Sequence, residues 1–311
     1  MLATFDESAW RTSPEAVRDA LEANRIVYFP ACPLPLPPEE TLDFLRRELP
    51  ARLKLKNVSY HPEADKVSGL EADAETAARV TEVLRSHLHE VQSFLRRVTG
   101  DLTAGARVGT CSFRPIEEKG RNLKPHASNE LVHVDAGAYG ATDGDRILRF
   151  FVNVNPSRDR VWATKGDFEA MIARHGARAG LLDDAGRLRM RIEKRGADRV
   201  VSALVAGLAR LNPLATVIDT SPYDRAMRRL HNYMKDDPGF LADKEGYLEM
   251  RFPPFSAWMV FTDGVSHASL EGQFALVTTM IVRRASMRWP ERAPFNALLA
   301  RASRPSPVHA A

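Results

Sequence analysis

The hydrophobic period of this chain changes near residue 105, and this change constrains the fold more than any other feature. Upstream, apolar residues recur at spacings of three and four. Downstream, short runs rich in β-branched and aromatic residues alternate with Gly, Pro and Asp, a pattern typical of strands in an antiparallel barrel or double sheet. The runs are ARVGTCSFRP, ELVHVDA, RILRFFVNVNP, DRVWAT, YLEMRFP, SAWMVFTD and QFALVTTMIV. The sequence therefore predicts a mostly β fold with flanking helices.

Two stretches have clear helical signatures. Residues 71–98 carry apolar side chains at helical spacing, which predicts a long amphipathic helix that covers one face of a sheet. A second helix is expected to begin at Ser221, because serine can cap, Pro222 suits the first helical position and Asp224 suits the first turn. This helix belongs to a predicted helical insertion at about 165–240, between barrel strands.

Three regions follow from these patterns. Residues 1–104 are expected to form a helical and irregular segment that packs on the barrel. Residues 105–290 would form the β core, and 291–311 a basic C-terminal tail. With 311 residues, 44% hydrophobic and 27% charged, the chain can bury a large core, so fibrous and disordered classes are excluded.

The N-terminal sequence and the cysteine content predict a cytoplasmic protein. The first twenty residues lack the basic start and apolar core of a secretory signal, and no run of 18 apolar residues suggests a membrane span. The two cysteines, Cys32 and Cys111, are expected to remain free thiols in a reducing compartment.

The pair His133 and Asp135 is the strongest candidate for chemistry. In an extended segment, residues i and i+2 point to the same side, so an imidazole and a carboxylate can reach one cation together. His267, between two predicted strands, can supply a third ligand. Two histidines and one carboxylate form the facial triad of non-haem Fe(II) oxygenases, which leaves positions open for a co-substrate and dioxygen. A strand histidine bonded to a nearby acid is the alternative interpretation.

Longer segments give this motif a context. The chain resembles the 3-deoxy-D-manno-oct-2-ulosonic acid (Kdo) hydroxylase family of Fe(II)/2-oxoglutarate-dependent dioxygenases, in register over about 105–287 and more loosely through SYHPEADKVSGL. The resemblance implies a double-stranded β-helix of cupin type in which His133, Asp135 and His267 bind Fe(II) and are the catalytic residues. It also implies hydroxylation at C3 of Kdo on lipid A, with O2 consumed and succinate and CO2 released. The segments that carry it are SFRP, HVDAGAYGATDGDRILRFFVNVNP, RVWAT, LHNYMKD and WMVFTDGVSHASLEGQFAL.

The far carboxylate of 2-oxoglutarate needs a cationic partner, and arginine suits it because its planar fork bonds a carboxylate bidentately. Many related enzymes place this arginine about ten residues after the distal histidine, where this chain has Val277, Thr278 and Thr279. Other candidates lie on strands before the insertion, and salt bridges at the barrel rim are their alternative role. In order of preference the candidates are Arg149, Arg114 and Arg160, with Trp162 and Asn153 expected to share the pocket.

The sugar acid is expected to meet the helix that contains LHNYMKDD. His231, Asn232 and Lys235 fall at helical spacing and offer donors to hydroxyls and a carboxylate, although a solvated helix face is the alternative. Thr262 and Asp263, shortly before His267, are candidates to orient the ligand imidazole. Weaker candidates for the substrate site are His61, Lys124 and His126.

The basic charge is concentrated near the C-terminus. The chain has 44 Lys and Arg against 40 Asp and Glu, a net charge of +4, and residues 281–311 hold six Arg and one Glu, a net of +5. Such a segment is expected to touch the inner membrane or the phosphates of Kdo-lipid A or a related anionic glycolipid. A solvated tail is the alternative.

Two other functions stay open at this stage. The first is a Jumonji-like hydroxylase of protein or nucleic acid, although no RNA-binding module is recognisable and no nucleic acid is expected. The second is a cupin-like metal-binding protein that turns nothing over.

Overall fold

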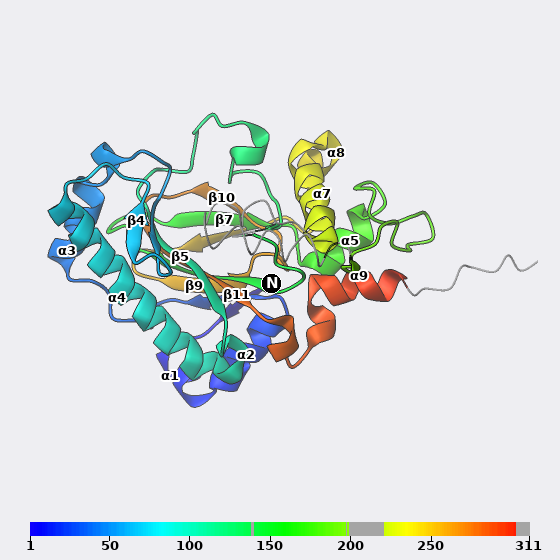
Figure 1. Ribbon diagram of the computed structural model, residues 1–311, viewed down its shortest axis with the longest axis horizontal. Helices are drawn as coiled ribbons and strands as arrows, with labels where there is room; N and C mark the ends of the chain where they lie inside the picture. The colour runs from blue at the N-terminus through cyan, green and yellow to red at the C-terminus, as the bar shows by residue number, and fades with distance from the viewer. Residues whose placement is uncertain (138–139, 197, 199–220, 303–311) are drawn as a thin grey trace, which may run out of the picture.

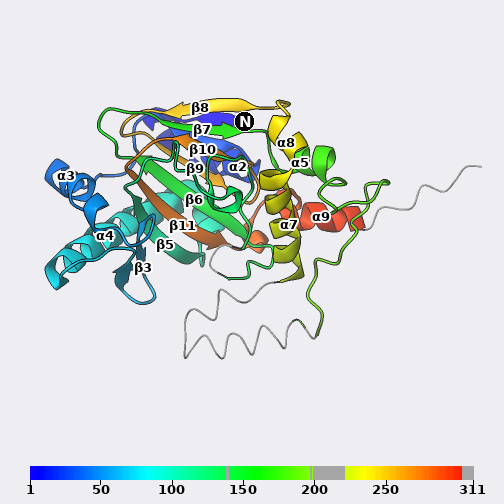
Figure 2. The ribbon, with the colours of Figure 1, turned by 90° about the horizontal axis from the view of Figure 1, so that it is seen from above.

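The computed structural model describes residues 1–137, 140–196, 198 and 221–302. Two β-sheets face each other, and helices cover the outer face of the larger one (Figures 1 and 2). The fold is therefore a mixed α/β fold with one large and one small sheet. Among the described helices, none is long and apolar enough to cross a membrane.

The large sheet has eight strands in the order β1-β2-β9-β6-β11-β5-β3-β4. The pair β1 and β2 is parallel, and the remaining neighbours are antiparallel. The strands span Leu2–Thr4 (β1), Ile26–Phe29 (β2), Val58–His61 (β3), Lys66–Ser68 (β4), Arg107–Arg114 (β5), Arg146–Asn153 (β6), Ala257–Phe261 (β9) and Ala275–Val282 (β11).

The small sheet has three antiparallel strands in the order β10-β7-β8. They span Ala268–Glu271 (β10), Arg160–Thr164 (β7) and Leu248–Phe252 (β8). Stacked aromatic rings fill the space between the sheets: Trp258 lies 5.0 Å from Phe151 and 4.0 Å from Phe252, measured between ring centroids.

The N-terminal helices pack on the outer face of the large sheet. The longest, α4 (Ala74–Thr99), presents an apolar face that includes Val80, Leu84 and Phe94, all nearly inaccessible to solvent. The side chain of Asp73 caps its first turn. The other helices of this layer are α1 (Glu7–Thr12), α2 (Pro14–Glu22) and α3 (Glu39–Arg47), with short 3₁₀ turns η1 (Pro50–Arg52) and η2 (Gly100–Thr103).

A second group of helices lies at one end of the two sheets, on the right of Figure 1. The insertion predicted at 165–240 contributes three of them, and residues 199–220 of that insertion lie outside the described residues. The group consists of α5 (Phe168–His175), α7 (Pro222–Asp236), α8 (Pro238–Ala242) and α9 (Pro294–Ala302). The remaining elements among the described residues are the 3₁₀ turns η3 (Pro125–Ala127), η5 (Arg284–Ser286) and η6 (Pro290–Arg292).

Most of the predicted elements are present. The helix expected over 71–98 is α4, and the helix expected from Ser221 is α7, whose first turn carries the full capping box. Six of the seven β-rich runs form strands. The run ELVHVDA does not, because it pairs only through one isolated bridge.

The prediction of helices and irregular chain for residues 1–104 missed four strands, β1 to β4. These strands have three or four residues each, too few for alternation to show in the sequence, and they add to both edges of the large sheet.

Candidate metal centre

His133, Asp135 and His267 come together at one end of the space between the sheets. One ligand atom from each lies within 4.8 Å of the others, and His133 Nε2 is 3.7 Å from Asp135 Oδ1. Both histidines are buried, and the Asp135 side chain is 13% exposed. The sequence prediction that these three residues converge is therefore matched by the geometry.

A short backbone bridge sets this geometry. The His133 N–H donates to the His267 carbonyl at 3.0 Å, and the His267 N–H donates back at 2.8 Å. Two residues on, the Asp135 N–H donates to the Thr262 carbonyl at 2.8 Å. The two chain segments are thus locked side by side, 134 residues apart in sequence.

The two ring nitrogens of each metal-site histidine have different roles. His133 Nδ1 lies 2.7 Å from the Leu131 carbonyl, and His267 Nδ1 lies 3.0 Å from the Val265 carbonyl. A carbonyl only accepts, so each Nδ1 is the protonated donor and each Nε2 keeps its lone pair. Two Nε2 lone pairs and one carboxylate are the donor set of a divalent first-row metal.

Electrostatics favour the protonation states that a metal needs. Burial, together with the neighbouring His267, holds the pKa of His133 well below its usual value, and burial lowers the pKa of His267. Burial alone would raise the pKa of Asp135, but the Arg149 guanidinium outweighs it and holds that pKa far below its usual range. The site therefore presents two neutral imidazoles and one carboxylate at neutral pH.

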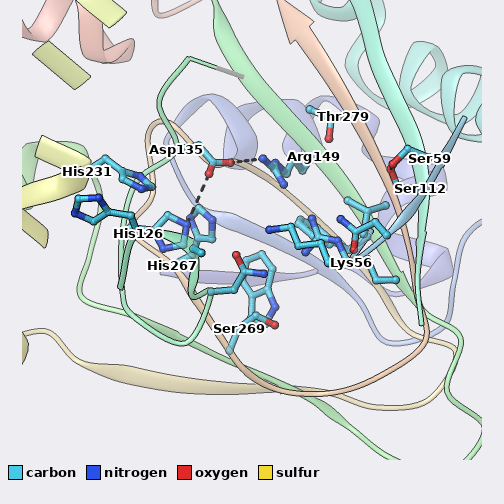
Figure 3. A pocket seen from close by; sticks show the side chains of 18 of the residues that line it. Lys56, Ser59, Ser112, His126, Asp135, Arg149, His231, His267, Ser269 and Thr279 are labelled. Carbon is cyan, nitrogen blue, oxygen red and sulfur yellow. Dashed lines mark hydrogen bonds and ion pairs between the residues drawn. The ribbon is translucent and has the colours of Figure 1, made fainter. Parts of the chain in front are cut away.

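A cavity of about 330 Å³ opens beside these residues (Figure 3). Its floor is made by cross-strand neighbours of the large sheet. Arg149 on β6 pairs with Thr279 on β11, and Phe151 on β6 pairs with Val277 on β11, which pairs in turn with Ser112 on β5. The volume suits a small organic acid together with part of a sugar.

Arg149 lies in this cavity, as predicted, and also beside the metal-ligand carboxylate. Its Nη2 is 2.8 Å from Asp135 Oδ2, and its Nε is a buried donor without a hydrogen-bond partner among the described residues. Thr279 is one of the three positions, with Val277 and Thr278, at which the sequence lacks the arginine expected after His267. In this chain the cation is one strand away, on β6.

The other two candidate arginines surround a buried carboxylate. Arg160 Nη2 is 3.0 Å from Glu118 Oε1, and Arg114 Nη1 is 3.9 Å from the same oxygen. Arg114 lines the cavity. Arg160 lies behind its wall and donates to the hydroxyl of Ser269, which lines it. Burial would raise the pKa of Glu118, but Arg160 and Arg114 outweigh it and lower that pKa.

Trp162 lines the cavity and Asn153 does not. The Trp162 ring stacks on His267 at 5.3 Å, and its Nε1 is buried without a hydrogen-bond partner among the described residues. The Asn153 amide instead donates to the carbonyls of Arg158 and Phe252, both at 2.9 Å. The prediction that Asn153 shares the pocket is wrong, because the strand ends there and the following turn occupies its side chain.

Helix α7 brings two of the three predicted sugar-binding residues to the cavity. His231 Nδ1 donates to the Val134 carbonyl at 2.8 Å, and its ring lies 5.0 Å from that of His133. Lys235 Nζ donates to the Ser128 carbonyl at 2.8 Å, and burial lowers its pKa to about 8. Asn232 is not among the residues that line the cavity, because a one-residue step turns it away from the face that holds His231 and Lys235.

The residues expected to orient His267 have other partners. Asp263 is buried, accepts from Arg146 Nε at 2.7 Å and from the Ile147 N–H at 3.0 Å, and so ties the loop to β6. Thr262 contacts Asp135 and lowers its pKa through a side-chain hydrogen bond. The imidazoles are oriented by backbone carbonyls.

Several lining residues carry no chemical motif that sequence reasoning could have found. They lie on β3, β5, β10 and β11 or in the segments beside β3 and η3, and only the fold brings them to the cavity. They include Lys56, Asn57, Ser59, Ser112, Asn129, Ser269 and Thr279. His126, a weaker candidate in the sequence, also lines the cavity, whereas His61 Nε2 lies 2.8 Å from the Ser68 hydroxyl and neither His61 nor Lys124 lines it.

Comparison with known proteins gives a family match over almost the whole chain. A family described as "3-deoxy-D-manno-oct-2-ulosonic acid (Kdo) hydroxylase" matches residues 5–305. No curated protein sequence matches the chain.

Solved structures of one relative superpose on most of the chain. The crystal structure of "the Kdo hydroxylase KdoO, a non-heme Fe(II) alphaketoglutarate dependent dioxygenase in complex with alphaketoglutarate and Fe(III)" has a TM-score of 0.78 at 25% identity, covering 96% of this chain and 95% of that one. Its complex with succinate and Fe(III) has a TM-score of 0.77 at 25% identity and covers 98% and 99%. The apo structure gives 0.78 at 26% identity and covers 96% and 95%.

Proposed function

Since the chain belongs to the Kdo hydroxylase family of Fe(II)/2-oxoglutarate-dependent dioxygenases, we propose that it hydroxylates C3 of Kdo attached to lipid A and releases succinate and CO2. Alpha-ketoglutarate, bound in the relative KdoO, is the same compound as 2-oxoglutarate. The observation that carries this proposal is the convergence of His133, Asp135 and His267 beside a cavity with arginines in its wall.

The three converging residues fit an iron ion. Each Nε2 has its lone pair available because Nδ1 donates to a backbone carbonyl, and Asp135 remains ionised. His133, Asp135 and His267 would hold the metal on one side and leave the cavity side open. Bound iron supplies the oxidation that couples decarboxylation of 2-oxoglutarate to insertion of one oxygen atom of O2 into a C–H bond of the sugar.

The cavity also fits an anionic co-substrate. Arg149 Nε and Trp162 Nε1 are buried donors without hydrogen-bond partners among the described residues, and a carboxylate supplies the acceptors that such donors need. Arg149 and Arg114 would bind 2-oxoglutarate directly. Arg160 would act from behind the wall through Ser269.

The α7 residues would hold the sugar acid. His231 keeps Nε2 free because Nδ1 donates to the Val134 carbonyl, and its ring packs against His133, so a group bound there lies next to the metal ligands. Lys235 offers a positive charge to the Kdo carboxylate. Burial lowers the pKa of His231, which favours the neutral ring.

We also propose that the two sheets form a double-stranded β-helix. Two facing sheets with the ligands at one end suit a double-stranded β-helix core with a helical insertion at 165–240. The regions 1–104, 105–290 and 291–311 keep their proposed roles as packing segment, core and tail. The Kdo-lipid A substrate would place the enzyme in the cytoplasm, at the inner membrane.

Iron binding is tested first. Anaerobic reconstitution of the protein with Fe(II) and 2-oxoglutarate is expected to give a weak visible charge-transfer band. His133→Ala and Asp135→Ala should abolish the band, and Asp263→Asn, which leaves the three ligands in place, should keep it. A wild-type protein without the band, or ligand variants that retain it, would overturn the iron assignment.

Substrate identity needs a separate assay. Kdo-lipid A incubated with the enzyme, Fe(II), 2-oxoglutarate and O2 should gain one oxygen atom by mass spectrometry, with one succinate released per oxygen added. Succinate release without a mass change in Kdo-lipid A would leave the dioxygenase chemistry standing and disprove the proposed substrate.

A further inference from the structure

Two chain segments form opposite sides of the cavity mouth, and we call them the rim segments: residues 50–57 and residues 119–129. The first contributes Lys56 and Asn57 to the cavity wall, and the second contributes His126, Ala127 and Asn129. Figure 3 shows Lys56 and His126 on opposite sides of the cavity. In Figure 1 both segments lie at the upper edge of the molecule.

The rim segments carry more positive charge than the whole protein does. They contain six Lys and Arg and no Asp or Glu, a net of +6. The rest of the chain then has 38 basic and 40 acidic residues, a net of −2. The net charge of these two segments is therefore opposite in sign to that of the remainder of the chain.

Part of this charge is available to a partner. No ion pair of Lys56 or Lys124 is present in the described part of the chain. Lys54 is paired at 3.5 Å with Glu71, and both side chains are mostly exposed. Exposed pairs of this kind contribute little, so a phosphate can replace the glutamate at low cost. Arg121 instead turns inward to Glu118.

Each rim segment also exposes a leucine. Leu55 is 63% exposed, the highest value among the exposed large apolar side chains of the described residues, and Leu123 is 37% exposed. Leu55 lies between Lys54 and Lys56, and Lys124 follows Leu123. A single exposed leucine is ordinary on a protein surface. Two of them beside lysines, on both sides of one mouth, have the composition of segments that lie in a membrane interface.

We propose that the rim segments form a surface that docks on an anionic lipid bilayer, with the cavity mouth facing the lipid headgroups. This proposal rests on the proposed function, because a sugar linked to lipid A stays at the bilayer surface and must enter the cavity from that side. The leucines enter the headgroup region, and the lysines contact lipid phosphates.

In this proposal the rim segments, and not the C-terminal region, make the membrane contact; residues 303–311 of the predicted tail lie outside the described residues. Arg288 is paired with Glu15 and Asp19, and Arg301 is paired with Glu169 at 2.6 Å. Arg288 bridges two carboxylates at once and the Arg301 side chain is only 10% exposed, so both charges are balanced within the protein, unlike Lys54 with its single exposed partner. Helix α9, which carries Arg301, also lies away from the upper edge in Figure 1.

Vesicle co-sedimentation of the full chain tests the docking surface. The vesicles are phosphatidylethanolamine with phosphatidylglycerol, and phosphatidylcholine alone is the neutral comparison. One variant combines Leu55→Ser with Leu123→Ser, and a second combines Lys54→Gln with Lys124→Gln. None of these four residues lines the cavity. Leu248→Ser is the matched control, because Leu248 is 45% exposed on β8, away from the mouth.

The lysine variant should bind anionic vesicles at least about tenfold more weakly, since each basic group at such a surface contributes about fivefold. The leucine variant should also lose binding, and Leu248→Ser should bind like wild type. Binding of the rim variants equal to wild type, or equal losses in Leu248→Ser, would overturn the proposal. Unchanged melting temperatures exclude misfolding as the cause.

Turnover separates this proposal from the proposed function. Rim variants should hydroxylate a water-soluble Kdo glycoside at the wild-type rate and lose activity on Kdo-lipid A embedded in vesicles. Equal activity of wild type and variants on both substrates would overturn the docking surface. If wild type turns over neither substrate, the proposed function fails, and vesicle binding still decides the docking surface.

Discussion

At the scale of single residues, Arg149 has two anionic neighbours in the proposed complex. One is Asp135, at 2.8 Å from its Nη2, and the other is the carboxylate of 2-oxoglutarate. The planar guanidinium can serve both because its donors point in different directions, and the Nε donor is still without a partner among the described residues. A lysine at this position has one charged group and cannot reach both acceptors in the same geometry.

The change Arg149→Lys is therefore expected to raise KM for 2-oxoglutarate at least about tenfold, because a hydrogen bond to a charged group is worth about 1.5–3 kcal/mol. Initial rates of succinate release measure this effect. Arg158→Lys is the control, since Arg158 is 59% exposed and does not line the cavity. An unchanged KM in Arg149→Lys would move the carboxylate contact to Arg114.

The residue scale also shows what the sequence could and could not predict. Alternation along a strand puts Arg149 and Phe151 on one face of β6, and both line the cavity. The same alternation failed at Asn153, because β6 ends there and the amide bonds to carbonyls of the next turn and of β8. Lys56 could not be found, since its segment meets the cavity only through the pairing of β3 with β5.

At the scale of elements, the N-terminus of α7 is fixed to the loop that follows Asp135. The buried Asp224 carboxylate accepts from the Ser221 N–H at the cap, and from the N–H and hydroxyl of Thr142 at 3.0 and 2.7 Å. The sequence predicted the cap from Ser221 to Asp224. It could not predict the loop contact, which joins residues 82 positions apart. This contact places His231 and Lys235 relative to the metal ligands.

Asp224→Ala should therefore lower the free energy of unfolding by about 3 kcal/mol, because it leaves several buried donors without an acceptor. It should also reduce turnover of the sugar substrate, since α7 is no longer held against the loop. Urea denaturation and succinate release measure the two effects. Asp6→Ala is the comparison, as it removes only an exposed cap on α1 and should cost about 1 kcal/mol. Similar losses in both variants would contradict the role of the loop contact.

Helix α4 contains a second element-scale feature, the buried His87. It is 2% exposed, its two ring nitrogens have no hydrogen-bond partner among the described residues, and burial lowers its pKa to about 4. In the unfolded chain a histidine titrates near pH 6.5. Above that pH the ring is neutral in both states and adds no pH dependence. As pH falls from about 6.5 to about 4, only the unfolded chain gains the proton, so stability decreases.

The decrease attributable to His87 should reach about 3 kcal/mol by pH 4. His87→Leu should remove this share and make the stability curve less steep between pH 6.5 and 4, measured by urea denaturation at a series of pH values. His89→Leu, at an exposed position on the same helix, is the control. If His87→Leu and wild type lose stability in parallel over this range, the burial of a neutral His87 is contradicted.

At the scale of the whole molecule, the sequence predicted the main β runs and the longest helix but missed how the N-terminal region joins the large sheet. The reason is physical: strands as short as β1 and β4 owe their conformation to pairing with a partner strand, not to their own residues. The charge distribution shows the same dependence on the fold. A count along the sequence finds basic excess both at 281–311 and in the rim segments, and only the structure shows that Arg288 and Arg301 are paired with carboxylates of the protein.

The ion pairs of Arg288 and Arg301 lead to a prediction for the C-terminal region. The double variant Arg288→Gln and Arg301→Gln should bind anionic vesicles within about twofold of wild type, because neither charge is free for lipid, whereas one free basic group at the surface contributes about fivefold. Its melting temperature should fall, since Arg301 joins α9 to Glu169 on α5 and Arg288 joins η5 and its neighbours to α2. Co-sedimentation and thermal denaturation of the same preparations measure both quantities. A loss of vesicle binding as large as that of the rim lysine variant would assign the membrane contact to the C-terminal region. The reason is that Arg288 and Arg301 are paired within the fold, so their removal can weaken lipid binding only if they exchange their carboxylate partners for lipid phosphate.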